Sequence, residues 1–304
     1  MLVLVFGLRW RWHDGQGSIT PRVAGAATGT RGALARRLAP HPLAHDDADR
    51  DGIPDSLEAS LADRYAPVVI LDAREHNRPA SIDWLLARVA PPGSAPVGLV
   101  QGLLAGRFQI GGHEFSDAVR AGSSDPRDWV TYVHVYPRTD GGISLQYWFF
   151  YTYNDGPLFF DHEGDWEHVT VALGPDGAPE AVYFAEHGNN NPGLYRSWRS
   201  VRREGDHPVV LSARGSHASY PDLGSVAWFD HASSCAQLQA CGAPVWRTWE
   251  AGGLTNVGER GAALGLGEVM RYRGRWGSDG RFLRSSPAPR APTLQGGFLA
   301  GGFD

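Results

Sequence analysis

The sequence predicts a mostly β protein: an antiparallel β-sandwich of jelly-roll type with a few short helices near its N-terminal side. Short runs alternate apolar and polar residues, Gly- and Pro-containing turn signals separate these runs, and no long helical pattern stands between them. The 304 residues include 39 Gly and 21 Pro, and 11% are aromatic. Many turns combined with many aromatic side chains are more typical of a sandwich than of a helical bundle.

The clearest strand signal is Ile143–Tyr153, where alternate positions are large and apolar. A strand over Asp165–Leu173 would place Asp165 and Glu167 on the same face as three aliphatic residues. Ser81 is a good N-cap for a short helix. The predicted helices are Leu57–Arg64 and Ile82–Val89, and the other predicted strands are Tyr65–Leu71, Val130–Tyr136, Ala181–His187 and Pro208–Ala213.

Composition divides the chain into four predicted parts. These are a leader or disordered linker over 1–44, a calcium-binding loop over 45–60, one β-sandwich domain over 62–290, and an irregular tail over 291–304. Cys235 and Cys241 predict a local disulfide if the compartment is oxidising.

The charge balance and the hydropathy pattern limit the classes of partner. The net charge is −5 and the pI about 6.2, which argues against nucleic acid as a partner. The sequence contains no apolar run of 18 or more residues, so no transmembrane helix is predicted. None of these features predicts the oligomeric state.

The strongest functional pattern is the acidic segment 47–58, which predicts a calcium-binding loop. Calcium requires six to eight oxygen ligands, and short calcium loops place carboxylates at alternate positions, a glycine at position 6 and a glutamate at position 12. Gly52 and Glu58 fall at those last two positions. The predicted ligands are Asp47, Asp49, Asp51, the carbonyl of Ile53, Asp55 and Glu58.

The segment resembles the calcium repeats of thrombospondin type 3 and dockerin modules and, more loosely, an EF-hand loop. The alternative is an acidic surface linker. A single copy containing Pro54 points to a structural ion rather than a sensor. Such a site suits the millimolar calcium found outside cells, so we expect a secreted or cell-surface protein, with a cytoplasmic location as the alternative.

A second candidate metal site lies about a hundred residues later. Carboxylates that face a core are costly unless they are paired or bind a metal. Three oxygen ligands with one nitrogen would suit Mg²⁺, Ca²⁺ or Mn²⁺. The alternatives are solvated charges on an edge strand and a carboxylate–Arg cluster. The predicted ligands are Asp155, His162, Asp165 and Glu167.

Two further histidines each follow a strand and precede a turn. His187 and His217 could meet at one rim of the sandwich and act as general acid or base, although a structural role is the alternative for each. Glu186 and Arg214 would complete a polar, ligand-binding cleft there.

Six ordered motifs resemble the vacuolar protein sorting-associated protein 62 family over roughly residues 62–290. They include the segment 162–170, which reads His-Glu-Gly-Asp-Trp-Glu-His-Val-Thr, and the segment 255–259, which reads Thr-Asn-Val-Gly-Glu. The other four motifs are 65–69, 75–84, 214–221 and 272–277.

A shorter stretch is similar to the necrosis- and ethylene-inducing peptide-like cytolysins. Their hallmark motif implies a divalent ion held by His162, Asp165 and Glu167, with Asp155 as a further ligand. Here Glu163-Gly164 departs from that motif.

Three functions are therefore considered. The first is a non-catalytic, metal-dependent protein that binds a glycan or a lipid head group at the rim. The second is a metal-dependent hydrolase of a phosphoester or a glycan, in which Asp165 and Glu167 hold the ion and His187 or His217 transfers the proton. The third is a secreted cytolysin-like toxin. Whether the protein is an enzyme is left open.

Overall fold

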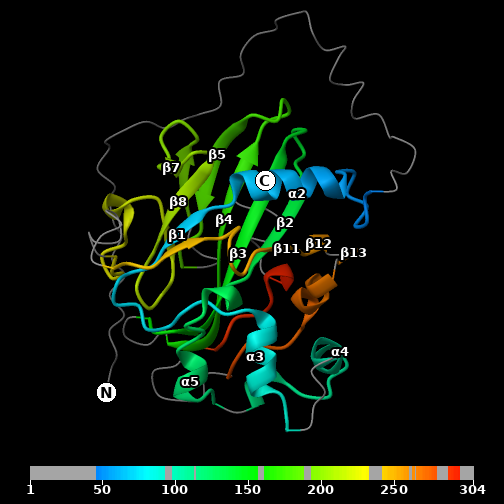
Figure 1. Ribbon diagram of the computed structural model, residues 1–304, viewed down its shortest axis with the longest axis vertical. Helices are drawn as coiled ribbons and strands as arrows, with labels where there is room; N and C mark the ends of the chain where they lie inside the picture. The colour runs from blue at the N-terminus through cyan, green and yellow to red at the C-terminus, as the bar shows by residue number, and fades with distance from the viewer. Residues whose placement is uncertain are drawn as a thin grey trace, which may run out of the picture. The chain divides into compact units, whose positions relative to one another are not determined.

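Two β-sheets and several short helices make up the computed structural model (Figure 1). The structure describes residues 46–92, 98–112, 114–156, 161–187, 193–232, 242–259, 262–263, 265–278 and 287–294. All of them belong to one compact unit, Leu43–Asp304. The predicted leader at 1–44 and the predicted disulfide between Cys235 and Cys241 lie outside the described residues.

The larger sheet has six strands in the order β11-β2-β3-β4-β5-β6. Its neighbours are antiparallel except for β11, which runs parallel to β2 at the edge of the sheet. The strands are β2 (Thr131–Pro137), β3 (Ile143–Asn154), β4 (His162–Leu173), β5 (Pro179–Phe184), β6 (Leu194–Ser197) and β11 (Leu254–Asn256).

The second sheet has five strands in the order β10-β1-β8-β7, with β9 also paired to β8. Here β1 and β8 are parallel, and the other pairs are antiparallel. The strands are β1 (Val68–Ile70), β7 (Arg203–Glu204), β8 (His207–Ser212), β9 (Ser219–Tyr220) and β10 (Val245–Arg247), while β12 (Gly258–Glu259) and β13 (Ala262–Ala263) form a separate hairpin.

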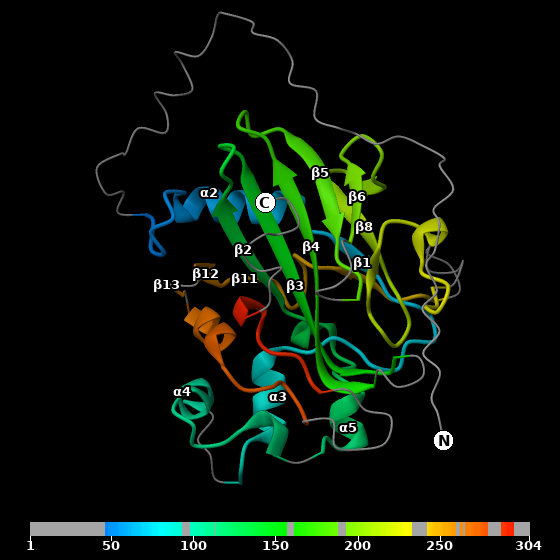
Figure 2. The same ribbon diagram turned by 180° about the vertical axis from the view of Figure 1, so that it is seen from behind.

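The main core lies between the two sheets and extends beneath helix α2 (Asp55–Tyr65). It takes alternate side chains of β3, including Tyr147 and Phe149, together with Val169 and Val171 of β4. Figure 1 shows α2 in front of β2–β4, and Figure 2, from behind, shows these strands in front of α2. The predicted sandwich and the predicted core faces of its two longest strands are therefore confirmed.

The opposite face of the larger sheet packs against short helices. Trp148 and Trp166 lie on this face with residues of α3, α4, α5 and η5. Helix α3 spans Ile82–Val89, and the Ser81 hydroxyl accepts a hydrogen bond from the Trp84 amide, as the sequence predicts. The remaining elements are α4 (Leu99–Leu104), α5 (Asp117–Arg120), η1 (Ile110–Gly112), η2 (Pro126–Asp128), η4 (Leu223–Ser225), η5 (Gly265–Arg271) and η6 (Pro292–Leu294).

None of the helices within the described residues combines the length and the apolar character that crossing a bilayer requires.

Candidate functional site

The acidic loop reverses direction tightly before it enters α2. Arg50 has φ 65° and Gly52 has φ 95°, a backbone region that glycine adopts without strain. The Ile53 amide donates to Asp51 Oδ1 at 2.6 Å, and the Ala48 amide donates to Asp55 Oδ1 at 3.0 Å. These bonds fold the loop back on itself and direct its carboxylates inward.

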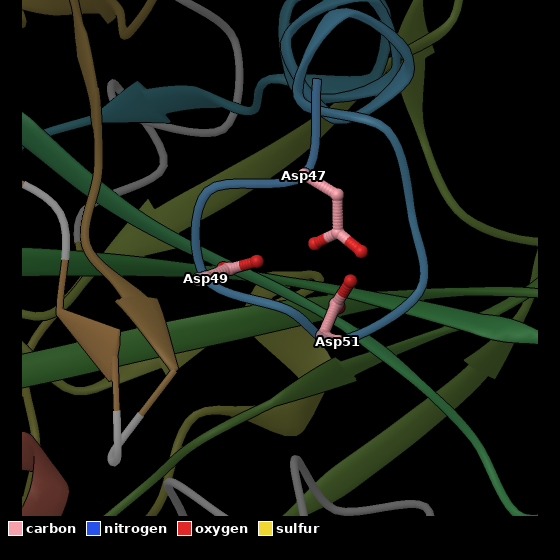
Figure 3. Close-up of side chains that lie close together, drawn as sticks. All are labelled: Asp47, Asp49 and Asp51. Atoms are coloured by element: carbon pink, nitrogen blue, oxygen red, sulfur yellow. The ribbon is translucent and has the colours of Figure 1, made fainter. Parts of the chain in front are cut away.

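Five carboxylates converge in two overlapping groups. One group is Asp47, Asp49 and Asp51, and the other is Asp49, Asp55 and Glu58; within each, one oxygen per residue lies within 4.8 Å of the others. Figure 3 shows the three carboxylates of the first group pointing toward one another. Asp49 belongs to both groups, so the two groups adjoin each other.

Several of these oxygens are buried without a hydrogen-bond partner. Asp49 is 3% exposed with neither carboxylate oxygen bonded, and Glu58 is 0% exposed with Oε1 unbonded. Asp47 Oδ1 and Asp51 Oδ2 are also buried and unbonded. Because an unpaired buried carboxylate is costly, this set of hard oxygen donors fits a divalent cation such as calcium.

The electrostatics of the loop agree with that fit. Burial is the main cause that raises the pKa of Asp49 to about 6, and the charges of Glu259 and Asp47 add to it. Burial likewise raises the pKa of Asp51 to about 7 and the pKa of Glu58 to about 8. Without a cation, burial and mutual repulsion therefore oppose the ionisation of these carboxylates, most strongly at Glu58.

Ile53 fixes the position of the loop through its side chain, which is buried in the main core. That the Ile53 carbonyl oxygen binds calcium stays a prediction.

A second polar cluster lies where the two sheets meet, and it contains its own cations. The Ala185 amide donates to the His168 carbonyl of β4, and the Ser219 amide of β9 donates to the Ala185 carbonyl. This point therefore joins the larger sheet to the second sheet. We call the polar cluster around it, formed by Glu75, Asp165, Glu167, His187, Ser216, His217, Tyr220 and Asp230, the junction network.

His217 is the centre of one half of the junction network. Its Nδ1 lies 2.9 Å from Asp165 Oδ2, and its Nε2 lies 3.1 Å from the Asn77 carbonyl and 3.7 Å from Glu75 Oε2. Both ring nitrogens thus face acceptors, which requires the doubly protonated imidazolium. The Tyr151 ring stacks on it with centroids 3.8 Å apart.

The pKa values in this half shift in the direction that a buried ion pair requires. Burial alone would lower the pKa of His217, but the charge of Glu75 and the hydrogen bonds to Asp165 and Glu75 raise it to about 9. Burial alone would raise the pKa of Glu75, but the charge and hydrogen bond of His217, with the Gly215 and Asn77 amides, lower it to about 2.

Asp230 is the centre of the other half. It accepts hydrogen bonds from His187 Nε2 at 2.6 Å, from the Tyr220 hydroxyl at 2.7 Å and from the Ser216 hydroxyl at 2.7 Å. The His187 side chain is 26% exposed and its φ is 51°, an uncommon conformation for a residue other than glycine. Its ring lies 4.8 Å from that of Phe229, beside Trp228, which is 90% exposed.

Glu167 is the carboxylate of the junction network that has no cationic partner among the described residues. Burial, followed by the charges of Asp165 and Asp230, raises its pKa well above the usual range. Glu186 is half-buried, and its charge helps to raise the pKa of His187. The Arg214 amide donates to the His231 carbonyl, which fixes the backbone of Arg214. A ligand-binding role for the Arg214 side chain stays a prediction.

The structure brings together only part of the predicted second metal site. Asp165 and Glu167 share a face of β4, but both ring nitrogens of His162 are engaged elsewhere, with the Gly164 carbonyl and the Asn154 amide. Strand β4 begins at His162 rather than at Asp165, because pairing with Tyr153 and Asn154 extends the ladder. Asp155 is exposed, and its amide donates to the Gly215 carbonyl.

Sequence reasoning missed four residues that hold these sites together. Glu75 and Asp230 organise the junction network, and Asn256 and Glu259 lie at the acidic loop. Three of them lie inside the motifs that carry the family resemblance: Glu75, Asn256 and Glu259. Those motifs were the sequence signal that could have identified them. No pattern in the sequence singles out Asp230.

Comparisons with curated proteins support the resemblance read from the motifs. An alignment 177 positions long, which covers 47% of this chain, is 26% identical to the vacuolar protein sorting-associated protein TDA6 of Saccharomyces cerevisiae. An alignment 107 positions long, which covers 30% of this chain, is 27% identical to vacuolar protein sorting-associated protein 62 of the same yeast. These matches cover 37% and 23% of the two relatives, so the chain matches well under half of their length. No protein-family model matches the chain.

Solved structures similar to this chain include necrosis- and ethylene-inducing proteins, the second family that the sequence resembles. Necrosis and ethylene inducing protein 2, from the causal agent of cocoa's witches' broom disease, aligns with TM-score 0.45 and 15% identity over 80% of this chain and 91% of that chain. NLPPya in complex with glucosamine aligns with TM-score 0.40 and 14% identity over 79% and 86%. Both TM-scores are below 0.5, so the description of the fold rests on the strand pairing of this chain.

Proposed function

We propose that this protein is a calcium-binding β-sandwich protein in which one ion, held by residues 47–58, fixes the loop and the first turn of α2 to the sandwich. The observation that carries the proposal is the burial of Asp49 and Glu58 with carboxylate oxygens that have no partner. The ligands would be Asp47, Asp49, Asp51, the Ile53 carbonyl, Asp55 and Glu58. Bound calcium would supply two positive charges to this group.

Calorimetric titration of the full chain with calcium, after treatment with a chelating resin, tests the proposal. We expect one equivalent to bind, and we expect Asp51→Ala to lose it. Asp63→Asn is the control, because it removes one exposed charge from α2 at a position outside the two carboxylate groups. A wild-type protein that binds no calcium would contradict the proposal.

The affinity for calcium would indicate whether the protein works outside the cell or in the cytoplasm. A dissociation constant of about 10⁻⁴–10⁻³ M, typical of extracellular modules, would support the secreted or cell-surface location. A dissociation constant near or below about 10⁻⁶ M would support the cytoplasmic alternative.

The second divalent ion predicted at Asp155, His162, Asp165 and Glu167 stays a prediction. Titration of Asp51→Ala with Mg²⁺, Ca²⁺ and Mn²⁺ tests it. One remaining equivalent that Asp165→Ala removes would support this ion, and no remaining equivalent would exclude it.

A second proposal concerns the ligand. We propose that the junction network binds a glycan or a lipid head group beside Trp228. In its favour, Trp228 offers a largely exposed indole next to Phe229, and His187 presents a partly exposed ring whose orientation Asp230 fixes. Sugar rings pack their C–H face on such an indole, while hydroxyl and amine groups bond to imidazole and carboxylate.

Binding to immobilised hexoses and hexosamines and to phosphatidylcholine or phosphatidylinositol vesicles tests this ligand proposal. We expect Trp228→Ala to abolish binding and Leu104→Ala, which removes exposed apolar surface from α4, to leave it intact. Equal binding by wild type and Trp228→Ala would contradict it.

The hydrolase remains the alternative at the same place, and the structure favours His187 over His217 as its proton-transfer group. His217 is fully buried with both nitrogens bonded, whereas His187 is partly exposed and oriented by Asp230. Turnover of a phosphoester or glycan that His187→Asn abolishes would establish the hydrolase. Binding of the same compound without turnover would establish the binding protein. A cytolysin-like activity stays a prediction from the short motif alone, and leakage of dye from the vesicles above would test it.

A further inference from the structure

Residues from the far end of the domain lie against the acidic loop. Asn256, the last residue of β11, donates from Nδ2 to Glu58 Oε2 at 2.8 Å, although the two residues are 198 positions apart. The Asn256 Oδ1 in turn accepts from the Gly258 amide at 2.9 Å, which fixes the orientation of the amide group. One oxygen of Glu58 is thereby held by the sheet edge, and the other, Oε1, has no partner.

Glu259 of β12 brings a further negative charge to the same place. Its charge is the largest electrostatic cause, after burial, that raises the pKa of Asp49, and it also acts on Asp51. Figure 3 shows the hairpin of β12 and β13 beside the loop on the side of Asp49. The charge of Glu259 therefore acts on the loop carboxylates from outside the loop.

A buried histidine of the larger sheet holds Glu259 in that position. His134 Nε2 lies 2.9 Å from Glu259 Oε1, and the His134 side chain is 1% exposed in β2, where its ring stacks on Tyr136. The Val257 amide also donates to the Val133 carbonyl, so backbone bonds fix the segment between Asn256 and Glu259 to β2.

We infer that residues 256–259 are the second part of the calcium site, in which Asn256 is a positioning residue and Glu259 contributes negative charge. The inference rests on the proposed calcium function and extends it. Asn256 orients Glu58 so that Oε1 is left for the ion, and Glu259 adds attraction for a cation from outside the ligand set. Binding of the ion would then join the loop to β11, the edge strand of the larger sheet. This role accounts for the motif at 255–259.

The direct test is calcium affinity of the full-length variants Asn256→Ala and Glu259→Gln, measured by competition with a fluorescent chelator. Partners that orient metal ligands typically change affinity about 10–100-fold, so we expect at least about tenfold weaker binding for Asn256→Ala. We expect weaker binding for Glu259→Gln as well, because it removes a negative charge near the ion. Glu250→Gln, a matched loss of one exposed charge just before β11, should bind as the wild type does.

Amide hydrogen exchange of the wild-type protein gives a second readout that requires no variant to fold. Calcium should slow exchange at residues 46–58 and also at residues 254–259. If calcium binds and protects only 46–58, and both variants keep wild-type affinity, the inference is wrong while the proposed calcium site stands. If the wild type binds no calcium, the proposed function itself fails.

Discussion

The acidic loop and the junction network both bury several carboxylates, but among the described residues it is in the junction network that cationic side chains pair with them. In the network, His217 lies against Asp165 and Glu75, and His187 lies against Asp230. In the loop, the groups that face Asp49 and Glu58 are other carboxylates and one amide, that of Asn256.

As a result, the pKa shifts of the loop carboxylates and of the histidine-paired carboxylates have opposite signs, while Glu167, which has no cationic partner among the described residues, shifts upward as the loop carboxylates do. Burial raises the pKa of Asp49, Asp51 and Glu58, whereas paired histidines overcome burial and lower the pKa of Glu75 and Asp230. A buried carboxylate cluster is therefore stable by itself only where the chain supplies the positive charge. Where it does not, an external cation is required.

The largest expected effect comes from removing the internal cation. His217→Asn keeps a residue that tolerates the observed φ of 56° but removes the positive charge between Glu75 and Asp165. Breaking a buried pair in this way costs about 3–5 kcal/mol of unfolding free energy. Urea unfolding measures the loss. His76→Asn, at an exposed neighbour of Glu75, should change the unfolding free energy by less than about 0.5 kcal/mol.

A nearly equal effect should follow from pH. The folded pKa of His217, about 9, lies above the value of about 6.5 expected in the unfolded chain. The stabilisation is therefore complete below about pH 6.5 and is lost as pH rises through about 9, by roughly 3 kcal/mol in total. Unfolding in calcium-saturated buffer should show this decline in the wild type. The same decline in His217→Asn would show that another group causes it.

Calcium should have the next largest effect. At a free concentration of about 100 times the dissociation constant, a ligand that binds only the folded state adds about 2.7 kcal/mol. For a domain of this size that corresponds to a rise of roughly 5–10 °C in the melting temperature. A chelator should reverse the rise, and magnesium at equal concentration should give a smaller one, because it requires a smaller octahedral site. A melting temperature independent of calcium would remove the structural role of the ion.

Local patterns in the sequence predicted most of the fold. The alternation along β3 and β4 determines which side chains face the core, and Ser81 marks the start of α3. The acidic loop was predictable for the same reason, since its carboxylates lie within twelve residues. The parallel pairs β1–β8 and β11–β2 were not predicted, because each joins segments more than a hundred residues apart.

The residues that complete each site could not be found by spacing alone. Asp230 reaches His187 across 43 positions, and Asn256 reaches Glu58 across 198, so only tertiary structure brings these pairs together. The strand predicted from Asp165 begins earlier, at His162, because the pairing of β4 with β3 continues to Asn154.

The most direct test of the comparison is the stability of Asp49→Asn and Asp165→Asn, each measured with and without calcium at pH 8. Without calcium, Asp49→Asn removes a buried charge that has no partner, and it should stabilise the protein by about 1 kcal/mol after allowance for solvent screening. With calcium it should destabilise, because the ion loses a ligand. Asp165→Asn should destabilise under both conditions, because it removes a negative charge that pairs with His217. If Asp49→Asn is equally destabilising with and without calcium, the loop does not need an external cation and the account is wrong.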